Sequence, residues 1–413
     1  MNIIDLFAGA GGLSEGFIRK GFKPIAHIEM DKYASMTLKT RMGYHYLREK
    51  NKLQIYYDYI TGKMSREEFY SYIPEEINDT VLNIEISDST INSIFEIIDQ
   101  KLKESTGEEV DVIIGGPPCQ AYSLVGRARD PYGKEHDPRN HLYKQYVKFL
   151  KRFKPKMFVF ENVPGILSAG RGELFKDVQK YMSEANYEIE AKTLNSFDFG
   201  VLQQRKRVIL IGWRKELNLE YPDFEKINHN NVMVKDILID LPPLKPSEKI
   251  EYGEYLSPPT KYLEVSGIRG KSDVLTQHIS RAHNDRDREI YRIAIEMWNK
   301  EKRRLKYTDL PDHLITHNNL ESFLDRFKVV ASNLPYSHTV VAHISKDGHY
   351  YIHPDIYQLR SLTVREVARI QSFPDNFYFE GPRTAIFTQI GNAVPPLMAE
   401  KIAQKIKKML SSL

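Results

Sequence analysis

Cys119 is the only cysteine among the 413 residues of the chain, and it stands in the run IIGGPPCQAYS, residues 113–123. The run Val110–Ile114 is apolar enough for a buried strand, so the thiol is expected in the loop at that strand's carboxyl end. Pro117 and Pro118 stiffen this loop. A lone cysteine is more often a packing residue, but a thiolate in a stiff loop can act as a nucleophile. Position alone leaves both interpretations open.

An acidic residue takes the equivalent place on the next strand. In MFVFENVPG, residues 157–165, Glu161 follows four apolar residues. A carboxyl group there can stay protonated and act as a general acid, although a lone glutamate is more often a cap or an ion-pair partner. In QQRKRVILIG, residues 203–212, Arg205 and Arg207 alternate and are expected to point towards the same rim. Two arginines there suit a phosphate or the polar edge of a base.

The first strand is followed by a glycine-rich turn, DLFAGAGGL, residues 5–13. Its glycines permit close approach of the backbone to a ligand, and the following helix exposes amide groups at its start. Glu29 ends the second strand and can accept hydrogen bonds from ribose hydroxyls. The pair indicates an adenosine-type cofactor and does not distinguish a dinucleotide from S-adenosylmethionine.

Short β-branched runs alternate with helical patterns in the first half of the chain, which predicts an α/β fold with a mostly parallel sheet. The expected strands are Asn2–Phe7, Pro24–Met30, Val81–Glu85, Val110–Gly115, Met157–Glu161, Ile189–Leu194 and Val208–Trp213. The expected helices are Gly11–Lys20, Asp31–Thr40, Ser89–Lys103, His141–Phe153 and Leu174–Ala185. In such sheets ligands bind outside the carboxyl ends of the strands, where the residues above lie.

The strand–helix alternation stops after Trp213. We expect residues 1–214 to form a catalytic domain with an insertion at about 43–80, and residues 215–355 to form a smaller, irregular domain with a polar helix near Asp285–Lys302. Residues 356–413 are expected to return to the first domain. They begin with a helix that Thr363 and Glu366 start as a capping box, and they end with a helix over Pro396–Leu410.

Composition restricts the class of protein. A single cysteine excludes an intrachain disulfide and a cysteine-based zinc site, and it suits a reducing cytoplasm. The N-terminus is typical of a strand and turn rather than a signal peptide, and no apolar run approaches the roughly 20 residues of a membrane span. With 59 basic and 55 acidic residues, the formal charge of +4 permits a nucleic-acid partner without requiring one.

Six motifs in this order resemble the DNA (cytosine-5)-methyltransferase family of the bacterial restriction-modification type. They are DLFAGAGG, GGPPCQ, ENVPG, QQRKR, RSLTVREVARIQSFPD and QIGNAVPP, which together span Asp5–Pro396. Each is weak to moderate alone, and the ordered set is specific. The resemblance implies a Rossmann-like methyltransferase domain that uses S-adenosylmethionine and no metal, with residues 215–355 as a target-recognition domain for double-stranded DNA.

The chemistry of that family accounts for the candidate residues. Carbon 5 of cytosine is a poor nucleophile until a thiolate adds at carbon 6, and protonation of nitrogen 3 eases that addition. By resemblance, Cys119 is the nucleophile, Glu161 contacts nitrogen 3 and Arg205 contacts the carbonyl oxygen of the base. Arg207 is expected to support Arg205 or the cysteine loop. Because the reacting atoms are stacked inside a duplex, the base must be flipped out.

The resemblance also assigns the other contacts. Glu29 falls on the ribose, and Glu85 with Ile86 is preferred over Asp88 for adenine. A loop over residues 123–134 is expected to close over DNA. The expected cofactor residues are Phe7, Ala8, Gly9, Gly11, Glu29, Met30, Glu85, Ile86, Pro118 and Asn392, and the expected DNA contacts are Gln120, Ser123, Arg127 and Arg129. Basic residues of the smaller domain are further candidates for phosphate contacts, namely Arg281, Arg286, Arg288, Lys302, Arg303 and Arg304.

Three alternatives compete with this interpretation. A branch of the same architecture methylates cytosine in transfer RNA, but the sizeable segment after the QQRKR motif favours sequence reading on DNA. A nicotinamide oxidoreductase would leave Cys119, Glu161 and Arg205 without a joint purpose, and an inactive binding protein would not need both Cys119 and Glu161. We expect a cytoplasmic, nucleoid-associated monomer with a restriction endonuclease as its genetic partner.

Overall fold

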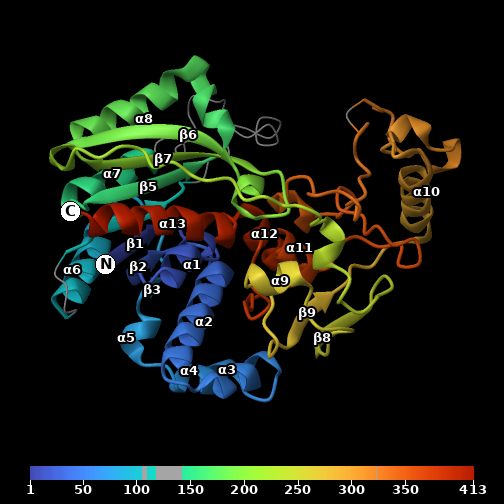
Figure 1. Ribbon diagram of the computed structural model, residues 1–413, viewed down its shortest axis with the longest axis horizontal. Helices are drawn as coiled ribbons and strands as arrows, with labels where there is room; N and C mark the ends of the chain where they lie inside the picture. The colour runs from blue at the N-terminus through green and yellow to red at the C-terminus, as the bar shows by residue number, and fades with distance from the viewer. Residues whose placement is uncertain (105–108, 118–141, 322) are drawn as a thin grey trace.

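The computed structural model describes residues 1–104, 109–117, 142–321 and 323–413 (Figure 1). Its centre is a seven-stranded sheet in the order β3-β2-β1-β4-β5-β7-β6. The strands β1 to β5 run parallel, while β7 is antiparallel to both of its neighbours. The strands are β1 Asn2–Leu6, β2 Lys23–Ile28, β3 Val81–Leu82, β4 Val112–Gly115, β5 Met157–Asn162, β6 Tyr187–Asn195 and β7 Lys206–Arg214. The predicted α/β class with a mostly parallel sheet is confirmed.

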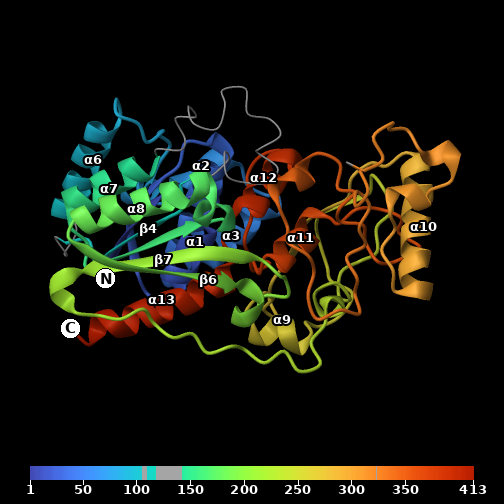
Figure 2. The ribbon, with the colours of Figure 1, turned by 90° about the horizontal axis from the view of Figure 1, so that it is seen from above.

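Helices cover both faces of this sheet, which is why its central strands are apolar on both sides. One face packs against α6 Ile91–Glu104, α7 Leu142–Phe153 and α8 Glu173–Glu184. The other packs against α1 Gly12–Arg19 and the last helix, α13 Pro396–Ser411. Figure 2 shows α6, α7 and α8 above the sheet and α13 below it. The first helix, α1, and the last helix, α13, therefore share one hydrophobic core on the same face of the sheet.

Several expected elements have other bounds in the structure, α2 and β3 among them. The helix α2 spans Lys32–Glu49 instead of ending at Thr40, and Asp31 caps it by accepting a hydrogen bond from the Ala34 amide at 2.8 Å. The expected insertion therefore begins after this helix, with α3 Leu53–Ile60, α4 Arg66–Ser71 and α5 Glu75–Asn78. Buried aromatic side chains join it to α2, among them Tyr44, Tyr56, Tyr59 and Phe69. The strand β3 ends at Leu82, three residues earlier than expected.

Residues after β7 form an irregular region with a two-stranded antiparallel sheet of β8 Lys249–Gly253 and β9 Leu275–Ile279. Its helices are α9 Lys261–Val265 and α10 Asp285–Glu301, and then follow α11 Val364–Ile370 and α12 Arg383–Asn392. The division into domains at residues 214 and 355 stays a prediction. The 3-10 helices of the described residues are Pro164–Leu167, Ala169–Gly172, Ser196–Phe199, Lys215–Leu217, Val234–Ile237, Tyr307–Asp309, Asp312–Leu314 and Ala342–Ser345.

A capping box starts α11, as predicted. The Thr363 hydroxyl accepts from the Glu366 amide at 3.2 Å, and the Glu366 carboxylate accepts from the Thr363 amide at 2.7 Å. The two orphan amides at the start of this helix are therefore satisfied. All seven residues of α11 are buried.

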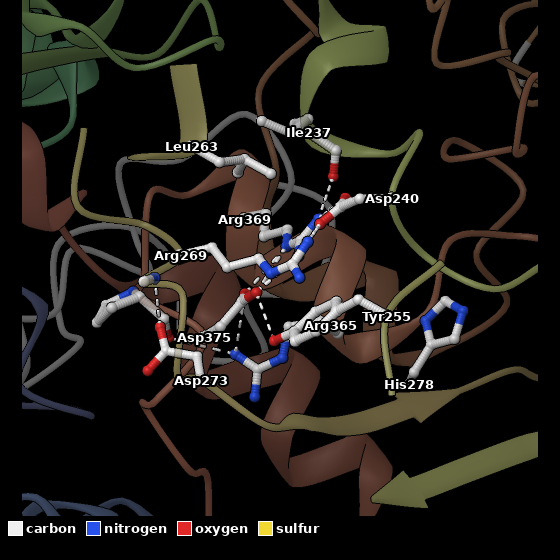
Figure 3. Close-up of polar contacts among 12 residues, drawn as sticks. Ile237, Asp240, Tyr255, Leu263, Arg269, Asp273, His278, Arg365, Arg369 and Asp375 are labelled. Carbon is white, nitrogen blue, oxygen red and sulfur yellow. Dashed lines mark hydrogen bonds and ion pairs between the residues drawn. The ribbon is translucent and has the colours of Figure 1, made fainter. Parts of the chain in front are cut away.

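Buried ion pairs connect α11 to the irregular region (Figure 3). Arg369 donates to both oxygens of Asp240, at 2.6 and 3.0 Å, and to Asp375 at 2.6 Å. Asp375 also accepts from the Tyr255 hydroxyl at 2.8 Å, and Arg269 pairs with Asp240. Because Arg369, Asp240 and Asp375 are fully buried, each charge depends on its partners for stabilisation. These pairs fix segments 237–240 and 255–269 onto α11.

Candidate active site

A cavity of about 550 Å³ opens at the carboxyl ends of the parallel strands. It lies at the boundary between β1 and β4. The strand order reverses there, since β2 and β3 follow on one side and β5 on the other. Ligands of open α/β sheets bind at such a point. The wall includes Phe7, Ala8, Gly9, Glu29, Met30, Glu85, Ile86, Gly116, Pro117, Glu161, Arg207 and Asn392. The structure thus brings together residues from all of the first four motifs and from the last one.

The glycine-rich turn bends back after β1 through left-handed backbone. Phe7 has a φ of 57° and Gly9 a φ of 55°. Gly11 has a φ of 84° and does not line the cavity; a Cβ there would lie 2.6 Å from a methyl carbon of Leu38. The turn therefore requires glycine at position 11, which we expected to contact the cofactor. Gly12, the next residue, lines the cavity instead.

Glu29 is held against this turn by two backbone amides. One carboxylate oxygen accepts from the Gly9 amide and the other from the Asp31 amide, each at 2.7 Å. Burial raises the pKa of Glu29 above its ordinary value, and the two amide hydrogen bonds oppose that rise. Each oxygen has a second lone pair, so the carboxylate can still accept a hydroxyl from a ligand in the cavity.

The adenine side of the expected cofactor site is formed by the segment after β3. Glu85 and Ile86 line the cavity beside Met30, whose side chain is 63% exposed. Asp88, the competing candidate, instead pairs with Lys148 and accepts from the Gln145 amide at 2.9 Å. The geometry therefore favours Glu85 and Ile86.

An ion pair joins the third and fourth motifs at the wall of the cavity. Glu161 lies on β5 and Arg207 on the adjacent β7, and the Arg207 Nε lies 2.7 Å from a carboxylate oxygen of Glu161. A Cβ on Gly116 would lie 2.7 Å from the other carboxylate oxygen, so only glycine fits beside it. Burial lowers the pKa of Arg207, and the Glu161 carboxylate opposes that shift.

Arg205 does not share this position, which corrects the expectation that both arginines face one rim. Its side chain is fully buried and does not belong to the described wall of the cavity. The guanidinium donates to the carbonyl oxygens of Val340 and Gly391 at 2.5 and 3.1 Å. The reason is that β7 begins at Lys206, so Arg205 lies in the preceding turn rather than on the strand.

The expected nucleophile Cys119 lies outside the described residues, as do Pro118, Gln120, Ser123, Arg127 and Arg129. The described chain reaches Pro117, whose carbonyl oxygen accepts from the Asn162 side-chain amide at 3.3 Å. Asn162, the second residue of the ENVPG motif, therefore holds Pro117, the last described residue before Cys119. The predicted closure of the loop over residues 123–134 stays a prediction.

Sequence reasoning missed several polar residues of the cavity. Asp5, 1% exposed, is the penultimate residue of β1, and one of its oxygens lies 3.4 Å from the Nδ1 of buried His27. Gln389 lines the wall and accepts from the Thr37 hydroxyl at 2.7 Å. The signal for Asp5 was present, because a charged residue inside an apolar strand needs a partner or a ligand. Gln389 gave no comparable signal.

Four arginines among the expected phosphate contacts in the smaller region have partners within the chain, and Lys302 donates to the Asn299 carbonyl oxygen at 3.1 Å. Arg281 donates to the carbonyl oxygens of Ile344 and Ser345 at 2.9 and 3.2 Å. Arg303 pairs with Asp309 at 2.7 Å, Arg288 pairs with Asp285, and Arg286 donates to the Thr316 hydroxyl at 2.9 Å. Arg281 is thus a structural residue, while the other three lie at the surface.

The reversed strand order, the glycine turn and the acidic residue directly after β2 define a protein with a Rossmann-like fold. Residues 1–69 and 68–408 match the family profile of the C-5 cytosine-specific DNA methylases. The chain belongs to this family and is a DNA (cytosine-5)-methyltransferase, so the resemblance predicted from the six motifs is confirmed. A profile of DNA methylases does not favour the RNA alternative.

Curated relatives match over the full length. The Type II methyltransferase M.Bpa9945I of Bacillus paralicheniformis is 45% identical over 446 residues, covering 100% of this chain and 99% of the relative. The Type II methyltransferase M.DdeI of Desulfomicrobium norvegicum is 32% identical, covering 98% of this chain and 88% of the relative.

Solved structures support the fold. A prophage-encoded protein of E. coli, assigned as a DNA modification methyltransferase, has a TM-score of 0.64 at 24% identity and covers 100% of this chain and 99% of its own. The Entamoeba histolytica methyltransferase EhMeth has a TM-score of 0.55 at 14% identity, with 99% and 98% covered. Among the described residues no helix has the length and apolar character needed to span a membrane.

Proposed function

We propose that this enzyme methylates carbon 5 of one cytosine within a specific sequence of double-stranded DNA, as the modification partner of a restriction endonuclease. The observation that carries the proposal is the Glu161–Arg207 pair, 2.7 Å apart, in the wall of a cavity that also contains Glu29. In this proposal, the carboxyl group that contacts the edge of a base and the acceptor for a ribose share one cavity. The full-length similarity to type II methyltransferases supports the assignment.

The residues present suit S-adenosylmethionine. A volume of about 550 Å³ lies within the range of small-molecule sites. Glu29 can accept ribose hydroxyls, Met30 and Ile86 offer apolar contacts to adenine, and Asn392 lies on the same wall. When bound, this cofactor supplies the electrophilic methyl group that carbon 5 attacks.

The protein's own groups activate the base. The Cys119 thiolate forms a bond to carbon 6 while Glu161, in its protonated form, gives a proton to nitrogen 3. Carbon 5 then carries the electron density of an enamine. After methylation, a water molecule takes the proton from carbon 5, the electrons of that C–H bond form the carbon 5–carbon 6 double bond and expel the Cys119 thiolate, and nitrogen 3 returns its proton to Glu161. Glu161 holds the base edge throughout, and the guanidinium beside it stabilises the carboxylate that forms.

We assign the contact with the base's carbonyl oxygen to Arg207 instead of Arg205. Arg207 lines the cavity next to Glu161, whereas Arg205 is occupied by two backbone carbonyls. A target cytosine must leave the duplex to reach this cavity, at a cost of a few kcal/mol that contacts to DNA offset. Residues 215–355 are the proposed source of the sequence-reading contacts.

The test combines a covalent trap with mapping. Bisulfite sequencing of DNA from cells that express the wild type should reveal one enriched motif, absent with Cys119→Ser. A duplex carrying 5-fluorocytosine at that site, added with S-adenosylmethionine, should remain attached to the wild type through denaturation, because fluorine blocks release of the thiolate. Methylation without a trapped adduct would contradict the covalent mechanism, and activity on bulk RNA with none on DNA would contradict the substrate.

A further inference from the structure

The last carbonyl groups of α12 are satisfied by side chains from two distant parts of the chain. The Gln371 amide donates to the Ile390 carbonyl at 2.7 Å and to Ala393 at 3.4 Å, and Arg205 donates to Gly391 at 3.1 Å. A helix leaves its final carbonyls without internal partners, and a cationic donor there also complements the helix dipole. These donors therefore fix the C-terminus of α12, which leads directly into the cavity wall at Asn392–Val394.

Arg205 also holds a segment of the smaller region, residues 337–342, which we call the recognition segment. The side-chain oxygen of Gln203 accepts from the Val340 backbone amide at 2.7 Å, and the Arg205 guanidinium donates to the Val340 carbonyl oxygen at 2.5 Å. Backbone bonds extend this contact, because the Ser337 amide donates to Leu202 at 2.9 Å and the Gln204 amide donates to Ser337 at 3.0 Å.

A single buried connection therefore links the recognition segment with the cavity wall. The Gln203 side-chain amide donates to the side-chain oxygen of Gln371 at 2.7 Å. The side chains of Gln203, Arg205 and Gln371 are all 0% exposed. We call these three residues the joint. Glycine at position 391 permits direct contact as well, since a Cβ there would lie 2.3 Å from the Ala342 nitrogen. A displacement of the recognition segment must then move either the joint or the end of α12.

We propose that Gln203 and Arg205 are positioning residues that couple the recognition segment to the cofactor wall at Asn392–Val394, so that occupation of one stabilises the productive position of the other. The proposal rests on the cofactor site proposed above. The physical reason is that close interior packing and the direct hydrogen bonds of Gln203 and Arg205 keep the two segments at a fixed separation. Coupling between two sites in proteins is typically about 5- to 150-fold in affinity.

Hydrogen exchange with and without S-adenosylhomocysteine tests this coupling. In the wild type, saturating S-adenosylhomocysteine should slow amide exchange in residues 337–342 by about fivefold or more, although none of them lines the described cavity. Gln203→Met keeps the length of the side chain and removes its hydrogen bonds. In this variant the ligand should still bind, while its protection of residues 337–342 disappears.

Gln277→Met is the matched control. Gln277 is also a buried glutamine. Its side-chain amide donates to the Phe379 carbonyl oxygen at 2.7 Å, and its side-chain oxygen accepts from the Phe379 amide at 3.1 Å, so neither bond involves the joint. Gln277→Met should lose a comparable number of side-chain hydrogen bonds, but S-adenosylhomocysteine should still slow exchange in residues 337–342 of this variant. In methyl-transfer assays on plasmid DNA from an unmethylated host, Gln203→Met should raise the KM for S-adenosylmethionine more than Gln277→Met does.

The outcomes separate the two proposals. Binding of S-adenosylhomocysteine without slower exchange in residues 337–342 of the wild type overturns the coupling and leaves the cofactor site intact. Protection that persists in Gln203→Met, or that is lost equally in Gln277→Met, also overturns it. An absence of any binding contradicts the proposed cofactor site and the joint together.

Discussion

Glu161 and Arg207 form an ion pair across neighbouring strands, with the Arg207 Nε 2.7 Å from the Glu161 carboxylate. Both side chains are nearly buried, with 13% and 11% exposed. Their strands are antiparallel, and Glu161 on β5 is registered against Ile209 on β7, two residues from Arg207. The Arg207 side chain therefore extends diagonally across the two strands to the Glu161 carboxylate, and both side chains line the cavity.

Removal of either partner should reduce catalysis more than cofactor binding. We expect Glu161→Gln to lower kcat by about 10²- to 10⁴-fold, the usual contribution of a general acid. Arg207→Ala should lower it by about 10²-fold or more, as expected for a lost charge-stabilising donor. Tritium transfer to unmethylated plasmid DNA measures kcat, and calorimetry with S-adenosylhomocysteine measures binding. A large loss of binding with unchanged kcat would place the pair in the cofactor site instead.

Gly116→Ala should lower activity because the added Cβ would lie 2.7 Å from a Glu161 carboxylate oxygen and 2.8 Å from its carbonyl oxygen. The carboxylate must shift, and a misplaced catalytic group can cost about 10²-fold in rate. Gly270→Ala is the control, since a Cβ there meets only ordinary contacts at 3.4 Å or more. Equal rates for the two variants would show that the Glu161 position tolerates displacement.

Glu29 should make folding stability depend on pH. Burial raises its pKa above the ordinary value of 4.5, so the folded state binds this proton more tightly than the unfolded state. The contribution of Glu29 is therefore present at low pH and is lost as pH rises through the raised value. Because Glu29→Gln cannot titrate, the Tm of this variant relative to the wild type should rise between pH 4.5 and 7. A constant or falling difference would contradict the sign of the shift.

The buried network on α11 should matter more for stability than any surface pair. Arg369→Met leaves Asp240 and Asp375 buried without their main partner, so we expect a loss of about 3–5 kcal/mol in the free energy of unfolding. Arg303→Ala, which breaks the exposed pair with Asp309, should change the free energy of unfolding far less, because solvent screens that pair. Denaturant titration measures both values. If Arg369→Met does not fold, Arg369→Lys should fold with an intermediate loss.

The sequence alone determined the sheet, its helices and the order of the motifs. Apolar runs bounded by turn residues indicate strands buried on both faces, and the residues after parallel strands lie at one edge of the sheet, so Glu29 and Glu161 could be placed at a common site, while Asn392 was assigned to it by the family resemblance. Local chemistry likewise determined the capping box at Thr363, because its partners are three residues apart.

Tertiary structure decided which side chain of an alternating pair enters the site. Arg205 and Arg207 look equivalent in sequence, but β7 begins between them, and the backbone carbonyls of Val340 and Gly391 capture Arg205. Those partners lie 135 and 186 residues away in the chain. Local patterns carry no information about such distant acceptors, so the separate tasks of the two arginines follow only from how the folded chain packs.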